Sequence, residues 1–244
     1  MNPSGSQAVI NSGHIYTFEG RQYPSVTTVL SRTEDMENRN RLRNWRANFR
    51  MEGFRDAYDY TEYTSVRGTF VHFNVLNSLA FTPLDPEGLP AASKWMHRVE
   101  MLQKDVLASR SLWENSGIEV KNPMEMEQSY YHPELGYAGQ LDFRGLVRLP
   151  GEDEFLKTIM DLKTSKQIND KHRIQVGAYA QMYNLWNRDD PAVRGLVVSL
   201  HPSAKRAIIC NINRKELDFE ITAFNEHLEK FWNIPGIKGE YGLT

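Results

Sequence analysis

Two acidic residues and a lysine in the middle of the chain have the types and spacing that could hold a divalent cation. Asp161 and Lys163 form an Asp-x-Lys motif, and Asp142 precedes Asp161 by nineteen positions. Residues 140–149 and 154–163 each have the pattern of a strand, and they flank a turn signal that contains proline and glycine. A symmetric turn therefore places Asp142 opposite Asp161, with Cβ atoms roughly 4.5–5.5 Å apart. Lys163 then lies on the same face of the sheet.

A second predicted hairpin, just upstream, brings a third carboxylate to the same place. Residues 124–131 have a strand pattern, and the turn signal after them again contains proline and glycine. A symmetric turn here sets Glu127 opposite Asp142 and Glu125 opposite Arg144. A β-bulge or an asymmetric turn would shift this register and move the side chains to the other face.

Three carboxylates on adjacent strands repel one another unless a cation lies between them. Oxygen-rich sites of this kind suit hard divalent ions, so the expected cofactor is Mg²⁺ or Mn²⁺, as one ion or two. The lone Cys210 excludes a disulfide framework and a four-cysteine zinc or iron–sulfur site. It also suits a reducing compartment.

Length and composition are those of one well-packed domain without a global attraction to nucleic acid. The chain has 244 residues, of which 40% are hydrophobic and 25% charged, and its formal net charge is −2. It contains no apolar run of eighteen or more residues, so no membrane span is predicted. Residues 1–13 are polar and lack arginine, which predicts a flexible N-terminus and a cytoplasmic protein. We expect residues 14–244 to form a single domain, with a helical part over 14–110 and a core over 111–244.

The rest of the sequence predicts an α/β fold that would position the acidic cluster. After the three-strand meander, a strand–helix–strand order implies a right-handed crossover and a parallel pair. The other expected elements are a hairpin over 14–23, a short helix capped by Ser25 or Thr27, helices at about 37–51, 66–80 and 91–109, a helix from a cap at Asn169 or Asp170 to about Trp186, strands at 193–200 and 206–212, and a helix at 214–232. The expected product is a mixed central sheet flanked by helices, with an N-terminal helical segment that arches over the site.

Arginines are concentrated in one segment of the N-terminal part. The twelve residues 39–50 contain five arginines and no acid. At about 100° per residue, four of the arginines fall in one narrow stripe beside an apolar stripe of Leu42, Trp45 and Phe49. These four are Arg39, Arg43, Arg46 and Arg50. A stripe of one sign repels itself without a polyanion, so we expect contacts with backbone phosphates; a solvated helix face is the simpler alternative.

Several motifs together resemble the PD-(D/E)XK nucleases and, within them, the RecB-type exonucleases. The matching residues extend over about 66–180 and are His72 in RGTFVH, Glu127, Asp142 in YAGQLD, Asp161-Leu162-Lys163-Thr164-Ser165, and Gln175 with Tyr179. Residues 23–30 also resemble segments of phage-encoded members and of the mitochondrial genome maintenance exonucleases. Two positions depart from the pattern, because Leu141 replaces the proline of the family name and Gln140 replaces a frequent threonine.

The resemblance implies a restriction-endonuclease-like fold and metal-assisted hydrolysis of DNA phosphodiesters. It implies metal ligands at His72, Glu127, Asp142 and Asp161, with the backbone carbonyl of Leu162 as a further ligand. The iron–sulfur branch of the family needs four cysteines, so no cluster is expected here.

Three more residues receive roles from the resemblance. Lys163 would orient the attacking water and offset charge that develops on phosphorus. Gln175 would contact a phosphate or a metal-bound water, and Tyr179 would pack under the active strand or touch the DNA. Without the resemblance, Gln175 and Tyr179 are equally well read as the polar flank of a core helix, and His72 as a packed or capping histidine.

The expected activity is therefore that of a metal-dependent DNA exonuclease that acts on linear ends, single- or double-stranded. Replication and recombination proteins are the expected partners, and the likeness to phage-encoded members implies action in a bacterial host. Two alternatives remain, a restriction-like DNA endonuclease and a nuclease-fold DNA-binding scaffold for recombination. The first would need a base-reading element, and the second would be expected to lack a ligand or the lysine; the sequence shows neither feature.

Overall fold

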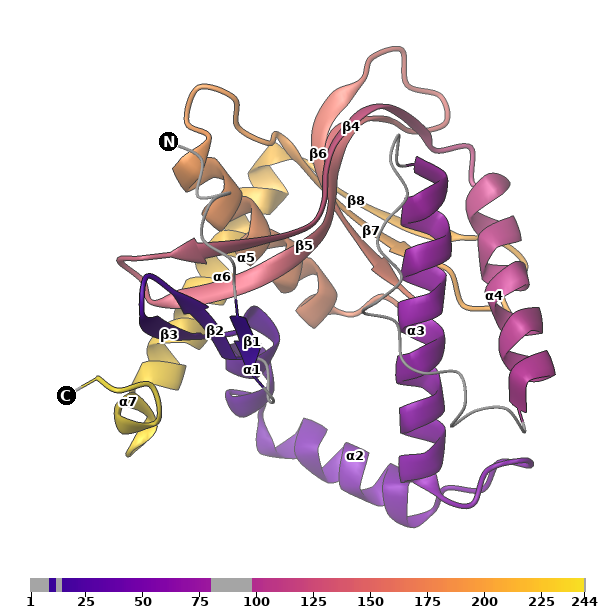
Figure 1. The fold of residues 1–244 in the computed structure, drawn as a ribbon, viewed down its shortest axis with the longest axis horizontal. Helices are drawn as coiled ribbons and strands as arrows, with labels where there is room; N and C mark the ends of the chain where they lie inside the picture. The colour runs from indigo at the N-terminus through magenta and orange to yellow at the C-terminus, as the bar shows by residue number, and fades with distance from the viewer. Residues whose placement is uncertain (1–8, 12–14, 80–97, 244) are drawn as a thin grey trace.

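A five-stranded mixed sheet with helices on both faces organises the molecule (Figure 1). The computed structural model describes residues 9–11, 15–79 and 98–243. The strands lie in the order β4 (Glu119–His132), β5 (Tyr137–Arg148), β6 (Leu156–Lys163), β7 (Arg194–Ser199) and β8 (Ile208–Ile212). The pair β6–β7 is parallel and the other neighbours are antiparallel. This mixed sheet flanked by helices confirms the α/β class that the sequence predicts.

The helices divide between the two faces of the sheet (Figure 1). One face is covered by α3 and α4, and the other by α1, α5 and α6. In chain order the helices are α1 (Val26–Arg32), α2 (Met36–Ala47), α3 (Ala57–Leu79), α4 (Val99–Glu114), α5 (Asp170–Trp186), α6 (Arg214–Trp232) and α7 (Ile237–Glu240). None of the helices in the described ranges is long and apolar enough to cross a bilayer.

Each face of the sheet has its own hydrophobic core because successive strand residues point to opposite sides. On β6, Ile159 belongs to the core under α5 and α6, whereas Met160 belongs to the core under α3 and α4. On β7, Val197 and Val198 divide in the same way. The six residues of β7 are all buried, which is typical of a parallel strand covered on both faces.

Capping boxes mark the starts of α5, which connects β6 to β7, and of α6, which follows β8. Asn169 caps α5 and forms a reciprocal capping box with His172. Asn213 and Glu216 form the same arrangement at the start of α6. Each box satisfies backbone N–H groups that a helix start leaves without partners. The positions of these two helices therefore follow directly from the sequence signals.

A small antiparallel sheet precedes the helices, as the sequence predicts. It consists of β1 (Val9–Asn11), β2 (Ile15–Phe18) and β3 (Arg21–Pro24), and β1 was not expected because it falls within the polar segment 1–13. The Phe18 ring stacks on Tyr131 of β4 at 4.4 Å between centroids. This contact fastens the N-terminal sheet to the central one.

The N-terminal helices differ in part from the expectation. The helix α3 begins at Ala57, nine residues before the predicted start at 66, because Asp56 accepts hydrogen bonds from the N–H groups of Tyr58 and Asp59 and so caps it. The predicted helix over 91–109 is observed from Val99, and its residues 91–97 lie outside the described part of the chain.

The apolar stripe predicted for α2 is not a buried helix face. This helix ends at Ala47 and has no buried residue, and Leu42 and Trp45 of the expected apolar stripe are 42% and 40% exposed. Phe49 is buried, but it lies beyond the helix end, as does Arg50. Asn48 is the C-cap, so Phe49 and Arg50 do not follow the helical spacing of about 100° per residue from which the stripes were predicted.

Candidate metal centre

The hairpin β5–β6 has the register that the sequence predicts. Its paired residues include Arg144 with Ile159 and Phe143 with Met160, and the ladder ends at the latter pair. Asp142 and Asp161 are the next residues on each strand. The Asp142 side chain continues the connection, because its Oδ2 accepts a hydrogen bond of 2.7 Å from the N–H of Leu162. The two strands therefore begin to separate at the acidic residues, and a carboxylate occupies the place of a ladder carbonyl.

The hairpin β4–β5 also has the predicted register beside Glu127. Met126 pairs with Phe143 and Gln128 pairs with Leu141, so Glu127 lies at the position opposite Asp142. Glu125 pairs with Arg144, as expected. The register shifts of this pair lie nearer the start of β4, before Glu125. The symmetric-turn assumption holds where the site is formed.

The backbone of Glu127 is unusual. Its φ of 52° lies in the left-handed region, which costs a non-glycine residue of order 1–3 kcal/mol. Its carbonyl accepts a hydrogen bond of 2.9 Å from Nε2 of Gln140. This local conformation turns Glu127 out of the regular pleat, and its carboxylate joins the side chains of Asp142 and His72.

His72 on α3 completes a group of three potential ligands. One ligand atom from each of His72, Glu127 and Asp142 lies within 4.8 Å of the others. Nε2 of His72 donates a hydrogen bond of 2.9 Å to the Leu162 carbonyl. In a neutral imidazole, Nδ1 then carries a lone pair, and it lies 3.6 Å from Oδ1 of Asp142. A cation between these two acceptors would satisfy both, and a ligating histidine commonly donates its other N–H to a backbone carbonyl.

Asp161 and Lys163 form a buried ion pair beside this group. Nζ of Lys163 lies 2.7 Å from Oδ2 of Asp161, whose side chain is 1% exposed. Asp161 is not one of the three residues with ligand atoms within 4.8 Å, although its charge acts on Glu127. The structure thus brings three of the four predicted side-chain ligands together. The fourth, Asp161, lies beside them and is paired with Lys163.

Burial and mutual repulsion perturb the acidic groups. Burial, followed by the charge of Asp142, raises the pKa of Glu127 to about 7. Burial also raises the pKa of Asp161 to about 6, while Lys163 acts in the opposite direction. For Lys163 itself, burial favours the neutral form, but the carboxylates of Asp161 and Asp142 raise its pKa above the usual value. Lys163 therefore stays protonated. Its single positive charge does not balance the carboxylates around it, as expected of a site that binds a cation.

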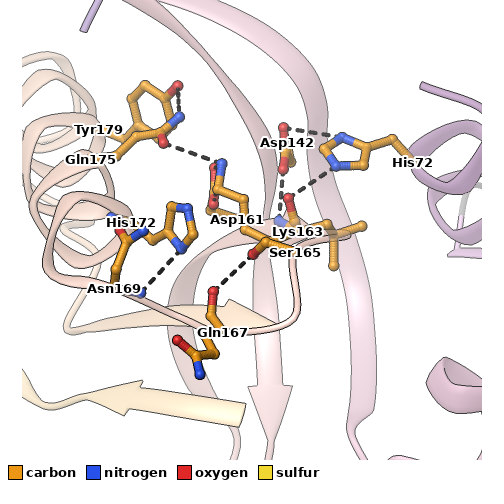
Figure 2. A network of polar contacts seen from close by, with 11 residues as sticks. His72, Asp142, Asp161, Lys163, Ser165, Gln167, Asn169, His172, Gln175 and Tyr179 are labelled. Atoms are coloured by element: carbon orange, nitrogen blue, oxygen red, sulfur yellow. Dashed lines mark hydrogen bonds and ion pairs between the residues drawn. The ribbon is translucent and has the colours of Figure 1, made fainter. Parts of the chain in front are cut away.

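Gln175 and Tyr179 are hydrogen-bonded to each other beside Lys163 (Figure 2). Oε1 of Gln175 accepts a hydrogen bond of 3.1 Å from Lys163, and its Nε2 donates one of 2.7 Å to the Tyr179 hydroxyl. Both ends of the amide are thus occupied by protein groups, and Gln175 positions Lys163. Tyr179 is buried, which favours packing under the strands over a contact with DNA. A Cβ at Gly139 would lie 2.7 Å from its ring, so this glycine of β5 makes room for it.

Three residues contribute to the site without having been predicted to do so. Tyr16 of β2 lies near the cluster, and burial followed by the charge of Glu127 raises its pKa to about 12. Arg67 donates a hydrogen bond of 3.1 Å to the Thr164 carbonyl and so fixes the chain just after Lys163. Burial followed by the charge of Lys163 lowers the pKa of His172 to about 4. Of these, Arg67 gave a sequence signal, because it precedes His72 on the same predicted helix.

Arg39, Arg43 and Arg46 lie on α2, whereas Arg50 lies beyond its end, so the four do not form the single helical stripe that was expected. Arg39 donates a hydrogen bond of 2.6 Å to the carbonyl of Arg32, and Arg50 donates one of 2.6 Å to the carbonyl of Phe49. The guanidinium of Arg46 lies over the Tyr58 ring at 5.3 Å. Arg43 is exposed. A continuous row of four arginines is therefore wrong, and a shorter basic patch of Arg39, Arg43 and Arg46 on α2 remains.

Comparison with known proteins adds little to this geometry. No protein-family model matches the chain, and no curated protein matches it. Among solved structures, SSO0001 aligns with a TM-score of 0.29 and 14% identity, over 83% of this chain and 87% of that one. A protein from Eubacterium rectale, provisionally named an exonuclease, aligns with a TM-score of 0.37 and 12% identity, over 92% of this chain and 79% of that one. Both TM-scores are too low to support an argument about fold or function.

Proposed function

We propose that this chain is a divalent-metal-dependent exonuclease that hydrolyses DNA phosphodiester bonds from strand ends, on a restriction-endonuclease-like sheet of the PD-(D/E)XK type. The observation that carries the proposal is the convergence of His72, Glu127 and Asp142 within 4.8 Å, beside the buried pair of Asp161 and Lys163. Degradation of DNA in replication, recombination or repair is the corresponding process.

The donor set fits Mg²⁺ or Mn²⁺. Two carboxylates and one imidazole would hold the ion. The charge of Asp161, which acts on Glu127, would also act on the bound ion. The Leu162 carbonyl accepts from His72, so its role in the proposal is to orient the imidazole. When bound, the ion would supply a water of lowered pKa and positive charge beside the scissile phosphate.

The protein's own contribution centres on Lys163. Asp161 and Gln175 hold its ammonium at 2.7 and 3.1 Å, from two different elements. A protonated lysine fixed in this way can donate a hydrogen bond to the attacking water or to a phosphate oxygen. It would offset negative charge that develops on phosphorus without having to reorganise. This role needs no covalent intermediate.

Linear and closed circular DNA distinguish the exonuclease from its alternatives. Incubation of both with Mg²⁺ or Mn²⁺ should release labelled mononucleotides or short fragments from linear ends and leave the circle intact. Linearisation of the circle would show an endonuclease instead. Binding of both DNAs without cleavage under any divalent ion would show a DNA-binding scaffold. The same reactions with EDTA are the control for metal dependence.

A further inference from the structure

A cleft of about 550 Å³ lies between α3, the end of α2 and the segment that follows β6. Its lining residues come from these three parts and from the segment after β7; they are Trp45, Met51, Tyr60, Thr61, Thr64, Ser65, Arg67, Thr164, Ser165, Lys166 and His201. Thr164, Ser165 and Lys166 directly follow Lys163. The cleft is therefore lined by the segment that directly follows the candidate metal centre in the sequence.

Aromatic and thioether side chains line the α2 part of the cleft. Trp45 and Met51 are 40% and 44% exposed. The Trp45 ring packs against Phe49 at 5.3 Å and against Tyr60 at 6.2 Å between centroids. Phe49 is buried and holds these rings in place. A rigid indole with an accessible surface is a suitable platform for a nucleobase, because every base has a face that can stack.

Cations and hydroxyl groups line the part near β6. Arg67 and Lys166 supply positive charge, and none of the described residues that line the cleft is acidic. The Arg67 guanidinium is only 6% exposed, and its nearest carboxylate is that of Asp105 at 3.3 Å. Its buried Nε makes no hydrogen bond with any described residue.

The pKa of His201 indicates that the electrostatic potential in this part of the cleft is positive. Burial lowers its pKa, and the charges of Arg67 and Lys166 lower it further, against a smaller effect of Asp105. Its Nδ1 accepts a hydrogen bond of 3.2 Å from the N–H of Ser203. The imidazole is therefore neutral, and the local positive potential comes from the arginine and the lysine.

We infer that this cleft receives one unpaired nucleotide of the DNA substrate, with the base against Trp45 and Met51 and the phosphate near Lys166 and Arg67. The inference rests on the proposed function, because a strand end must be presented to the neighbouring centre. Cavities of roughly 300–1,000 Å³ hold small ligands, so a single nucleotide fits whereas a stacked duplex does not. The substrate class is accordingly a single-stranded end or a duplex end with an unpaired terminus.

Binding without cleavage tests the inference directly. Fluorescence anisotropy of a labelled oligothymidylate would be measured in EDTA for the wild type, Trp45→Ala, Trp45→Phe and Lys166→Ala. Phe219→Ala and Lys215→Ala are matched controls, since Phe219 is exposed on α6 and Lys215 is exposed on the same helix. A blunt duplex of the same length serves as the second ligand.

Trp45→Ala is expected to weaken single-strand binding by roughly 5- to 150-fold, the range that base–aromatic stacking produces. Trp45→Phe should restore most of the affinity, because a phenyl ring still stacks, and it shows that the alanine effect is not a folding defect. The two controls should bind as the wild type does. Unchanged affinity in Trp45→Ala, or an equal loss for the blunt duplex, would overturn the inference.

The cleavage assay separates this inference from the proposed function. If the wild type degrades linear DNA with Mn²⁺ while Trp45→Ala binds oligothymidylate normally, the nuclease stands and the cleft assignment fails. If Trp45→Ala loses single-strand binding but no divalent ion supports cleavage by the wild type, the proposed function fails and the cleft is a binding site alone.

Discussion

Replacing Lys163 should slow DNA cleavage without weakening DNA binding. Its ammonium is held between Asp161 and Gln175, so Lys163→Ala removes a positive charge that the site keeps in a fixed position. We expect cleavage to slow by about 10²–10³, while DNA binding in EDTA remains. Single-turnover rates and anisotropy measure the two quantities, with Lys215→Ala as a surface control. A normal cleavage rate would show that Asp161 and Lys163 form a structural ion pair without a role in cleavage.

Glu127 should give the metal-free protein a characteristic dependence of stability on pH. Its pKa in the folded state is about 7, above the value of about 4.3 in an unfolded chain. Between these values the folded state binds the additional proton, so this contribution to stability is fully present below about pH 4 and is lost as the pH rises through 7. Asp161, with its pKa raised to about 6, acts in the same direction.

Thermal unfolding in EDTA between pH 5 and 8 measures this effect. The wild type should lose stability relative to Glu127→Gln as the pH rises, since glutamine cannot ionise and no longer repels Asp142. The difference between the two melting temperatures should level off above pH 7. Parallel curves over the whole range would contradict the assignment of Glu127 to a crowded acidic cluster.

The pair α5–α6 depends on a glycine at its closest approach. A Cβ at Gly177 would lie 2.7 Å from the backbone carbon of Glu220 and 2.9 Å from the nitrogen of Ile221. Backbone atoms cannot rotate away as a side chain does, so Gly177→Ala must separate the helices, at about 1–3 kcal/mol. Since 1 kcal/mol corresponds to about 2–4 °C in a chain of this size, we expect a melting temperature lower by roughly 2–12 °C.

Gly239→Ala is the matched control for this substitution. Gly239 lies in α7, and a Cβ there would meet no heavy atom within 4 Å. Its melting temperature should equal or slightly exceed that of the wild type. If both alanine variants melt as the wild type does, α5 and α6 are less closely packed than described.

The basic patch on α2 predicts a salt-dependent contribution to DNA binding. Each phosphate contact changes the slope of log K against log salt by about 0.7 on single strands and 0.9 on duplex. Replacing Arg43 and Arg46 with alanine should weaken binding to all sequences and flatten the slope by roughly one to two units. The double variant Arg188→Ala/Lys215→Ala removes two exposed cations elsewhere and should leave the slope unchanged. Equal slopes in both double variants would make the patch a solvated helix face.

At the scale of the whole molecule, the central sheet and its acidic cluster could be predicted because the signals were local. Both hairpins turn at glycines in the left-handed region, Gly136 with φ 76° and Gly151 with φ 85°. A tight turn fixes the pairing of the residues that follow it. This is why simple symmetry located Glu127 opposite Asp142. The cap of α5 at Asn169 was also a local signal.

Other features could not be predicted because they depend on tertiary contacts. Periodicity assigned Leu42 to a packed face, yet it is 42% exposed on α2, a helix without buried residues that connects α1 to the segment before α3 (Figure 1). The contacts of Gln175 were not predicted, because its helix position does not reveal that Lys163 and Tyr179 occupy both ends of its amide. The left-handed backbone of Glu127 also has no sequence signal, since glutamate rarely adopts it.

The proposed function requires that the carboxylates around Asp142 support metal-dependent hydrolysis. The most direct test is the rate of product release from end-labelled linear DNA as Mn²⁺ is titrated, for the wild type and Asp142→Asn. Asparagine retains an oxygen that can accept from the Leu162 N–H, so the substitution removes the charge and preserves the fold. The rate should saturate with Mn²⁺ in the wild type and stay at the EDTA background in Asp142→Asn. Equal rates in the two proteins, or wild-type cleavage in EDTA, would contradict it.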